Sequence, residues 1–147
     1  MVVKKVRTLG LRLLMIGIVC LTAMGCKKDA LSDPSANNIP DITDLEEIQS
    51  ITETAGISLL FFHNVWSKNC YEIRPVVEEL ALKEEYQDLV FFAEIEFDTN
   101  EPINRFYGIR GFPTIIIIKN RLERHRFTGK SHSLEDIESR LLNLINE

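Results

Sequence analysis

The residue types best suited to chemistry stand together in the run Trp66–Cys70, which reads Trp-Ser-Lys-Asn-Cys. This run separates an apolar stretch, Ile57–Phe62, from a segment with helical periodicity, Tyr71–Tyr86. A helix that starts directly after a strand presents unpaired backbone N–H groups and the positive end of its dipole, and both stabilise negative charge. The turn between the two elements is therefore the first place to look for a reactive group.

Ser67 can serve this turn in two ways. As a helix N-cap, its hydroxyl accepts a hydrogen bond from the N–H of residue 69 or 70, which is worth about 1 kcal/mol. As a nucleophile, it would need His63 as a base and an acid to orient the imidazole. No acid is evident, and His63 can equally fill an aromatic packing slot, so the sequence favours the cap.

Cys70 also has two interpretations. Free cysteine is among the most buried residue types and behaves as a small hydrophobe, and we favour this reading. Alternatively, Cys70 is a reactive thiol assisted by the helix terminus. Glu94 opposes that alternative if it is ionised nearby, because a like charge raises a thiol pKa. Glu94 itself fits either a half-exposed strand position or, beside Phe61, a buried carboxyl whose pKa is raised.

The N-terminus has the pattern of an export signal. The basic residues Lys4, Lys5, Arg7 and Arg12 precede an unbroken run of apolar and small residues, Leu13–Met24. Such a run is too short to cross a hydrocarbon core of about 30 Å, which favours a cleaved signal peptide over a permanent anchor. The run ends in Leu21–Cys26, which resembles a bacterial lipobox. We therefore expect residues 1–25 to be removed and Cys26 to carry lipid, which holds the domain at a membrane of the bacterial cell envelope, outside the cytoplasm.

Processing would change both the charge and the cysteine count. The full chain has 17 Lys and Arg against 22 Asp and Glu, and four of the basic residues lie within residues 1–25. The mature chain would carry a net charge of about −9, which argues against nucleic acid as a partner. Cys20 leaves with the signal and Cys26 carries lipid, so Cys70 is the single thiol of the folded part and cannot form an internal disulfide.

The rest of the chain divides into a tether, residues 26–42, and one folded domain, residues 43–147. Lys27–Pro40 shows no apolar period and is expected to stay unfolded. Helices are expected at 44–54, 71–86, 103–107 and from Ser133, where Asp136 completes a capping box, and strands at 57–62, 89–97, 115–118 and 122–127. Helical crossovers would make the first strands parallel, and a hairpin at Asn120-Arg121 would add an antiparallel edge. The expected fold is α/β, with a central mixed sheet of four to five strands and helices on both faces.

An ordered set of motifs resembles the thioredoxin family over roughly Asp44–Asn146. Trp66 precedes the turn, Pro75 lies inside the second helix, and Tyr107–Thr114 reads Tyr-Gly-Ile-Arg-Gly-Phe-Pro-Thr, close to the family's Tyr-Gly-Ile-Arg-Gly-Ile-Pro-Thr. The resemblance implies a thioredoxin-like fold in which the Phe112–Pro113 bond is cis and faces the active site. It also implies that the backbone beside this proline pairs with an extended peptide, which neighbouring aromatic side chains cover.

The same resemblance identifies changes in the residues that would carry redox chemistry. Ser67 stands where the family has its attacking cysteine, and a serine hydroxyl does not ionise near neutral pH. Cys70 matches the second, resolving cysteine. Phe61 replaces a buried aspartate that serves in proton transfer, and Glu94 stands where the lysine partner of that aspartate would be. The site equivalent to the active site, at Trp66, Ser67 and Cys70, is therefore expected to have lost dithiol–disulfide exchange.

The peptide-binding face implied by the resemblance, at Trp66, Phe112 and Pro113, is least affected by these changes. We expect the protein to bind an envelope protein or peptide there, with no cofactor and no metal. The alternative is a single-thiol redox protein, in which Cys70 forms mixed disulfides with a partner cysteine, a glutathione-like thiol or a second copy of the chain. A purely structural role is a third possibility.

Overall fold

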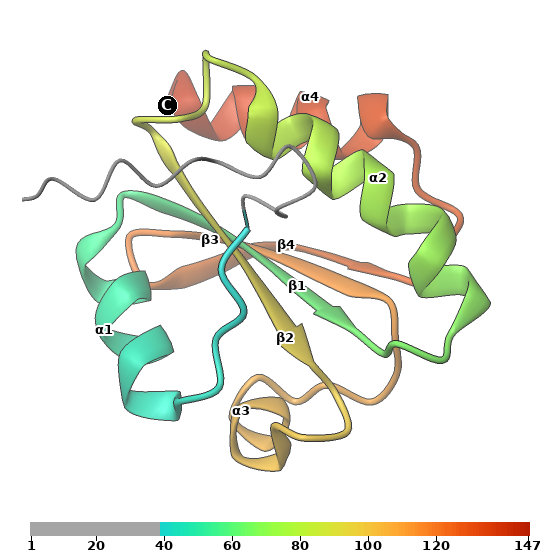
Figure 1. The fold of residues 1–147 in the computed structure, drawn as a ribbon. Helices are drawn as coiled ribbons and strands as arrows, with labels where there is room; N and C mark the ends of the chain where they lie inside the picture. Colours follow the sequence, from blue (N-terminus) through green and yellow to red (C-terminus); the bar gives the residue numbers. More distant parts are fainter. Residues whose placement is uncertain (1–38) are drawn as a thin grey trace, which may run out of the picture. The chain divides into compact units, whose positions relative to one another are not determined.

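The computed structural model describes residues 39–147, so the expected signal peptide, the lipidation site Cys26 and most of the tether lie outside the described residues. The elements of this part of the chain are α1 (Leu45–Thr54), β1 (Ile57–His63), α2 (Lys68–Leu82), β2 (Val90–Glu96), α3 (Glu101–Phe106), β3 (Thr114–Lys119), β4 (Leu122–Thr128) and α4 (Leu134–Ile145). The strands form one sheet in the order β2-β1-β3-β4 (Figure 1). Within residues 39–147 no helix is long and apolar enough to cross a membrane.

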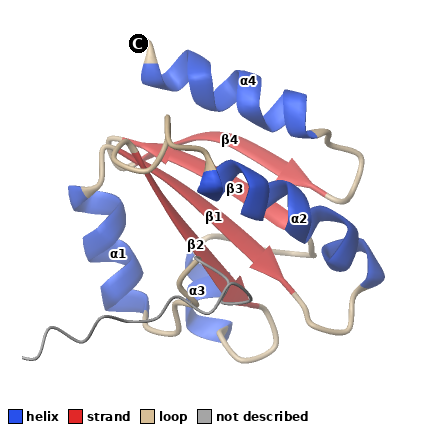
Figure 2. Cartoon of the chain, turned by 45° about the horizontal axis from the view of Figure 1, so that its top comes forward, coloured by secondary structure: helices blue, strands red, loops and turns tan. Residues whose placement is uncertain are grey.

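The sheet lies between two helical layers, which confirms the expected α/β class (Figure 2). On one face, α2 and α4 bury a common apolar core against the strands; their contributing side chains are Ile73, Val77, Leu80, Ile137, Leu141 and Leu144. On the other face, Ile48 of α1 and Ile103 of α3 join a second core. Both faces of the sheet are therefore covered, as in other doubly layered α/β folds.

β1 is a central strand, and all seven of its residues are buried. It pairs in parallel with β2 and antiparallel with β3. Leu59 and Phe61 belong to the core under α2 and α4, whereas Leu60 and Phe62 belong to the core under α1 and α3. A strand that is apolar on both faces is stable only between two other strands and two helical layers, as the sequence predicted.

The direction of β3 differs from what the sequence led us to expect. The six residues of α3 rise only about 9 Å, whereas the seven residues of β2 span about 23 Å. A helix this short does not cross back along β2, so the connection forms no helical crossover to the start of the sheet. β3 begins at the edge where β2 ends and runs antiparallel to β1, so β1 and β2 are the one parallel pair among the described strands.

The second helix ends earlier than its periodicity suggested. α2 stops at Leu82, and the N–H of Lys83 donates to the Leu80 carbonyl in a tightened last turn. Tyr86 lies in the following turn, with its side chain fully buried and its hydroxyl donating to Glu138 of α4 at 3.1 Å. The apolar spacing extended to Tyr86 because that ring packs in the core, although its backbone is no longer helical.

Two local predictions near the C-terminus are confirmed. Asn120 and Arg121 both have positive φ values, 52° and 68°, and join β3 to β4 in the tight turn that suits the twist of a hairpin. Ser133 caps α4, and the Asp136 side chain bonds back to the cap backbone in a complete capping box.

The folded domain begins earlier than the expected boundary at residue 43. Ile39 and Ile42 are each 4% exposed, and they enter the cores on opposite faces of the sheet. The Ile42 N–H donates to the Glu94 carbonyl, and the Glu94 N–H donates to the Pro40 carbonyl, both at 2.9 Å. Residues 39–42 therefore lie along the outer edge of β2, where two isoleucines and two backbone bonds hold them.

Candidate functional site

The turn between β1 and α2 is organised by Asn64, a buried residue that the sequence analysis missed. Its Oδ1 accepts the Trp66 N–H at 2.8 Å, and its Nδ2 donates to Asp98 at 2.7 Å. Its own backbone N–H donates to the Cys70 Sγ at 3.4 Å. Asparagine commonly bonds the backbone two residues on in this way, so its position directly after a strand was the signal that could have identified it.

Ser67 is the N-cap of α2. Its Oγ accepts the Cys70 N–H at 3.4 Å, and its backbone is extended, at φ −86° and ψ 116°, as a cap requires. The N–H of Ser67 donates to the Asn64 carbonyl at 3.1 Å. The capping interpretation is confirmed, and the hydroxyl is engaged with the helix start.

Cys70 faces inward from the first turn of α2. It is 3% exposed, and it is the free thiol of the described residues. The side of the turn that meets solvent is formed instead by Val65, Trp66 and Tyr71, which are 66%, 87% and 80% exposed. In this turn the thiol is therefore buried, and the side chains that contact solvent are large and apolar.

Behind Cys70, an ion pair joins the first helix turns to β2. Arg74 Nη1 lies 2.6 Å from Glu94 Oε2, and the guanidinium carbon lies 5.8 Å from the centroid of the Phe61 ring. The sequence analysis placed Glu94 beside Phe61, and the register confirms it, but it missed Arg74. The available signal was spacing, because Arg74 follows Cys70 by four residues and so shares its helix face.

His63 is part of the same cluster. It is 4% exposed and stacks on Phe61 with ring centroids 5.3 Å apart, so the aromatic packing slot is confirmed. Its Nδ1 lies 3.2 Å from a Glu96 carboxylate oxygen, and Arg74 Nη2 lies 3.2 and 3.3 Å from its two ring nitrogens. A carboxylate that could orient the imidazole is thus present, contrary to the sequence expectation. No hydrogen bond joins His63 to Ser67 in the described residues, so the base and the hydroxyl are not coupled.

Burial and charge shift the protonation of this cluster. Burial, reinforced by the Arg74 cation, lowers the pKa of His63 from 6.5 to about 4, so its imidazole is neutral at pH 7. Burial raises the pKa of Glu94, and the charge and hydrogen bond of Arg74 oppose that shift. Of the two interpretations left open for Glu94, a half-exposed strand residue or a buried carboxyl with a raised pKa, the direction of the shift agrees with the second, and Arg74 opposes the shift.

A family model described as Thioredoxin matches residues 42–143. This chain belongs to the thioredoxin family. Thioredoxin H5 of Oryza sativa is 29% identical over 112 residues, covering 74% of this chain and 79% of the relative. Thioredoxin 1 of Synechococcus elongatus is 33% identical over 79 residues, covering 54% and 72% respectively.

Solved thioredoxin structures support the same fold. Thioredoxin from Trypanosoma brucei brucei superposes with a TM-score of 0.66 at 22% identity, over 76% of this chain and 94% of that one. The Malassezia sympodialis thioredoxin gives a TM-score of 0.66 at 20% identity, over 75% and 93%. At these identities the likeness concerns the fold.

A second loop of the thioredoxin fold leaves the sheet at the same edge as the Asn64 turn, because the register pairs Phe62 of β1 with Thr114 of β3. The Phe112–Pro113 peptide bond in this loop is cis, as predicted. Phe112 is half-buried, with its ring centroid 5.1 Å from that of Phe97, and Pro113 is buried. Within the part of the chain that the structure describes, no hydrogen bond engages the backbone N–H or carbonyl of Phe112.

Proposed function

We propose that this protein is a lipid-anchored thioredoxin-fold protein of the bacterial envelope that binds a peptide or protein partner and has lost dithiol–disulfide exchange. The partner docks on the face formed by Trp66, Phe112 and Pro113. The observation that carries the proposal is the contrast within one turn, where Cys70 is 3% exposed and Trp66 is 87% exposed. The Trp66 side chain is accessible to a partner, whereas the Cys70 thiol is buried.

The loss of exchange follows from the chemistry of the turn. A dithiol cycle needs an exposed thiolate that attacks and a second thiol that resolves the mixed disulfide. Ser67 occupies the half-buried capping position, and its hydroxyl does not ionise near neutral pH. Cys70 is the one thiol of residues 39–147, so attack and resolution cannot both occur within this domain. Phe61 and Glu94 also take the places of the family's proton-transfer residues, and Glu94 is paired with Arg74.

The binding function rests on two features of the face. Exposed aromatic side chains such as Trp66 and Tyr71 provide large contact areas and are enriched among the residues that dominate binding energy. The unengaged N–H and carbonyl of Phe112 offer a donor and an acceptor to an extended peptide, in the manner of an added strand. Together these groups fit a partner segment that is extended in backbone and apolar in side chains.

A single-thiol function for Cys70 is the second candidate. The observation in its favour is a small hollow of about 130 Å³ whose lining includes Ser67, Cys70 and Arg74. There, the Cys70 thiolate would attack a partner disulfide, one partner sulfur would leave as a thiol, and a mixed disulfide would remain. The rate of Cys70 alkylation against pH separates the two candidates. We expect alkylation far slower than that of a free thiol in an unfolded peptide, and a comparable rate would favour the thiol function.

Binding at the face can be followed through Trp66, because it is the only tryptophan of the chain. A pool of extended, tryptophan-free peptides with alkylated cysteines is titrated against the protein. We expect a blue shift of the emission with saturation, unchanged by reductant or by Cys70→Ser. The control is Leu122→Ala, which removes an exposed apolar side chain from the hairpin and should leave binding intact. If peptides bind without changing the Trp66 emission, the partner binds at a surface other than the proposed face.

A further inference from the structure

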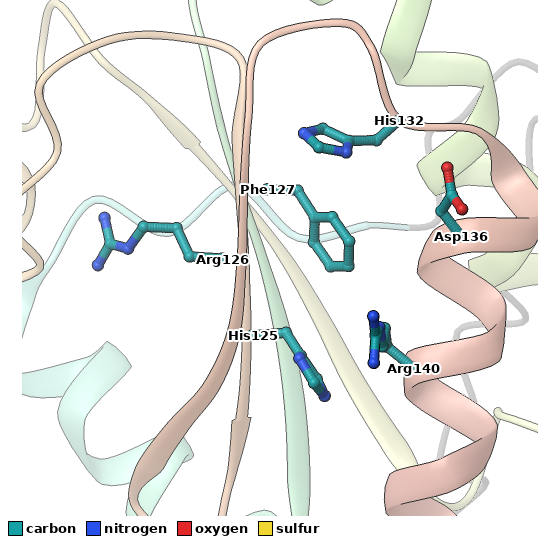
Figure 3. A pocket seen from close by; sticks show the side chains of 6 residues that line it. All are labelled: His125, Arg126, Phe127, His132, Asp136 and Arg140. Carbon is teal, nitrogen blue, oxygen red and sulfur yellow. The ribbon is translucent and has the colours of Figure 1, made fainter.

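A hollow of about 440 Å³ lies between the edge strand β4 and α4, and the turn that holds Cys70 contributes no side chain to its lining (Figure 3). His125 and Phe127 alternate along β4 and so point to the same side, where they meet the face of α4 that carries Asp136 and Arg140. His132 closes one end from the loop that precedes α4. Phe127 is buried, and the His132 ring stands edge-on to it with centroids 5.1 Å apart.

The charge of this hollow is unbalanced. Arg140 has no ion pair with any carboxylate among the described residues, although this chain is acidic overall. The neighbouring Arg124 and Arg126, by contrast, pair with Glu147 and Glu123. Arg126 also lines the hollow, although its side chain leaves the other side of β4 in Figure 3, and its guanidinium is paired with Glu123.

The carboxylate that lines the hollow, Asp136, also caps α4. Asp136 accepts the Ser133 N–H at 3.2 Å as half of the capping box of α4. It serves the helix start and forms no ion pair with Arg140, but its negative charge remains in the lining of the hollow. The lining thus combines the guanidinium groups of Arg140 and Arg126, two imidazoles and the Asp136 carboxylate around the Phe127 ring, so its guanidinium groups outnumber its carboxylate.

We propose that this hollow binds a small organic phosphate, with its phosphoryl group on Arg140, His125 and His132 and its apolar part on Phe127. A guanidinium presents paired N–H donors that match phosphate oxygens, and the imidazoles add further donors. His132 Nε2 lies 3.3 Å from the Thr128 carbonyl, which leaves its Nδ1 for the ligand. The volume falls in the range of small-molecule sites, about 300–1,000 Å³.

Protonation should accompany binding. The pKa of His125 is lowered by burial and by the cations Arg140 and Arg124, with Glu147 opposing them. A phosphate at Arg140 would cancel part of that repulsion, so the protein should take up a proton as the ligand binds. His132 faces the Thr128 carbonyl and the Phe127 ring, and the Asp136 carboxylate lines the same hollow.

The three histidines of the chain allow a direct test. The full chain, labelled at the histidine ring carbons and held in zwitterionic detergent, is titrated with phenyl phosphate and followed by NMR. We expect saturable shifts of the His125 and His132 signals and a rise in the pKa of His125, while the buried His63 signal does not move. Shifts that do not saturate, or that affect His63 equally, would overturn the proposal.

Variants and a second ligand make the test specific. Arg140→Gln should weaken phenyl phosphate binding about tenfold. Arg110→Gln, which alters another exposed arginine without an ion pair in residues 39–147, should not change it. Equal affinity in the Arg140→Gln variant would contradict the site. Benzoate should bind at least tenfold more weakly than phenyl phosphate, and equal binding of the two would overturn the assignment to phosphates.

Discussion

Arg74 on α2 forms an ion pair with Glu94 on β2, with Nη1 and Oε2 2.6 Å apart, and the guanidinium lies over the Phe61 ring. The family resemblance implies an aspartate at residue 61 with a lysine at residue 94. Here the carboxylate stands on β2 and the cation on α2. An ionic contact is thus kept in this part of the core, but the acid next to the cysteine position is gone.

Removal of the Arg74 charge should strongly destabilise the fold. Arg74→Met keeps the aliphatic stem and leaves the Glu94 carboxylate, whose side chain is 12% exposed, without this cation. We expect a loss of about 3 kcal/mol in the free energy of unfolding at pH 7, measured by urea denaturation. Adding Glu94→Gln should restore much of it. Arg105→Met removes an exposed pair with Glu101 and should cost less than about 1 kcal/mol, so equal losses would contradict the account.

His63 should make stability depend on pH between about 6.5 and 4. Its pKa falls to about 4 in the folded state, so in this interval the unfolded chain binds more protons. The stabilisation of the folded state by neutral His63 is complete above pH 6.5 and is lost as the pH falls towards 4. At about 1.4 kcal/mol per pKa unit, the loss amounts to about 3 kcal/mol. The raised pKa of Glu94 acts in the opposite sense. In His63→Phe, the melting temperature should therefore fall less as the pH is lowered from 6.5 to 4. An unchanged dependence on pH would mean that other groups cause the loss of stability.

The loss of redox function should be graded. Ser67→Cys rebuilds Cys-x-x-Cys at the start of α2, and we expect measurable but slow reduction of insulin, followed by turbidity with a recycling reductant. Phe61→Asp in addition should raise the rate, because Arg74 already lies over this position and can hold the new carboxylate. Glu94→Lys should be tolerated only if Arg74 is also replaced, since two cations would otherwise meet. Wild-type turnover equal to that of Ser67→Cys would mean that Cys70 alone is active.

Most of the fold could be predicted from the sequence because its signals are local. The apolar run of β1, the cap at Ser67 and the capping box at Ser133 each depend on neighbouring residues and are found where expected. The direction of β3 and the burial of Ile39 were not predictable in the same way. Both depend on how segments distant in sequence meet across the sheet.

In the candidate site, too, features that depend on neighbouring residues were predictable, and contacts between distant segments were not. The inward position of Cys70 agrees with the burial propensity of free cysteine, whereas the exposure of Trp66 runs against that of tryptophan. Arg74 could not be recognised as the partner of Glu94, because the pair is 20 residues apart and joins a helix to a strand. The contact of Asn64 with Asp98 spans 34 residues and was missed for the same reason.

Membrane attachment should depend on Cys26. The motivation is the order of basic, apolar, small and cysteine residues at the N-terminus. Cys26→Ser should abolish fatty-acid labelling and either leave the precursor uncleaved or release the protein from the membrane fraction. Cys20→Ser is the matched control and should have no effect. Unchanged labelling in the Cys26→Ser variant would rule out this residue as the lipidation site.

The most direct test of the central claim is capture of partners from envelope extracts by the full chain, with and without reductant, in parallel with Trp66→Ala, Leu122→Ala and Cys70→Ser. Our account predicts that a specific partner is retained by the wild type in reductant, by Cys70→Ser and by Leu122→Ala, and is lost in Trp66→Ala. A partner that disappears on reduction or in Cys70→Ser, or that persists in Trp66→Ala, would contradict it.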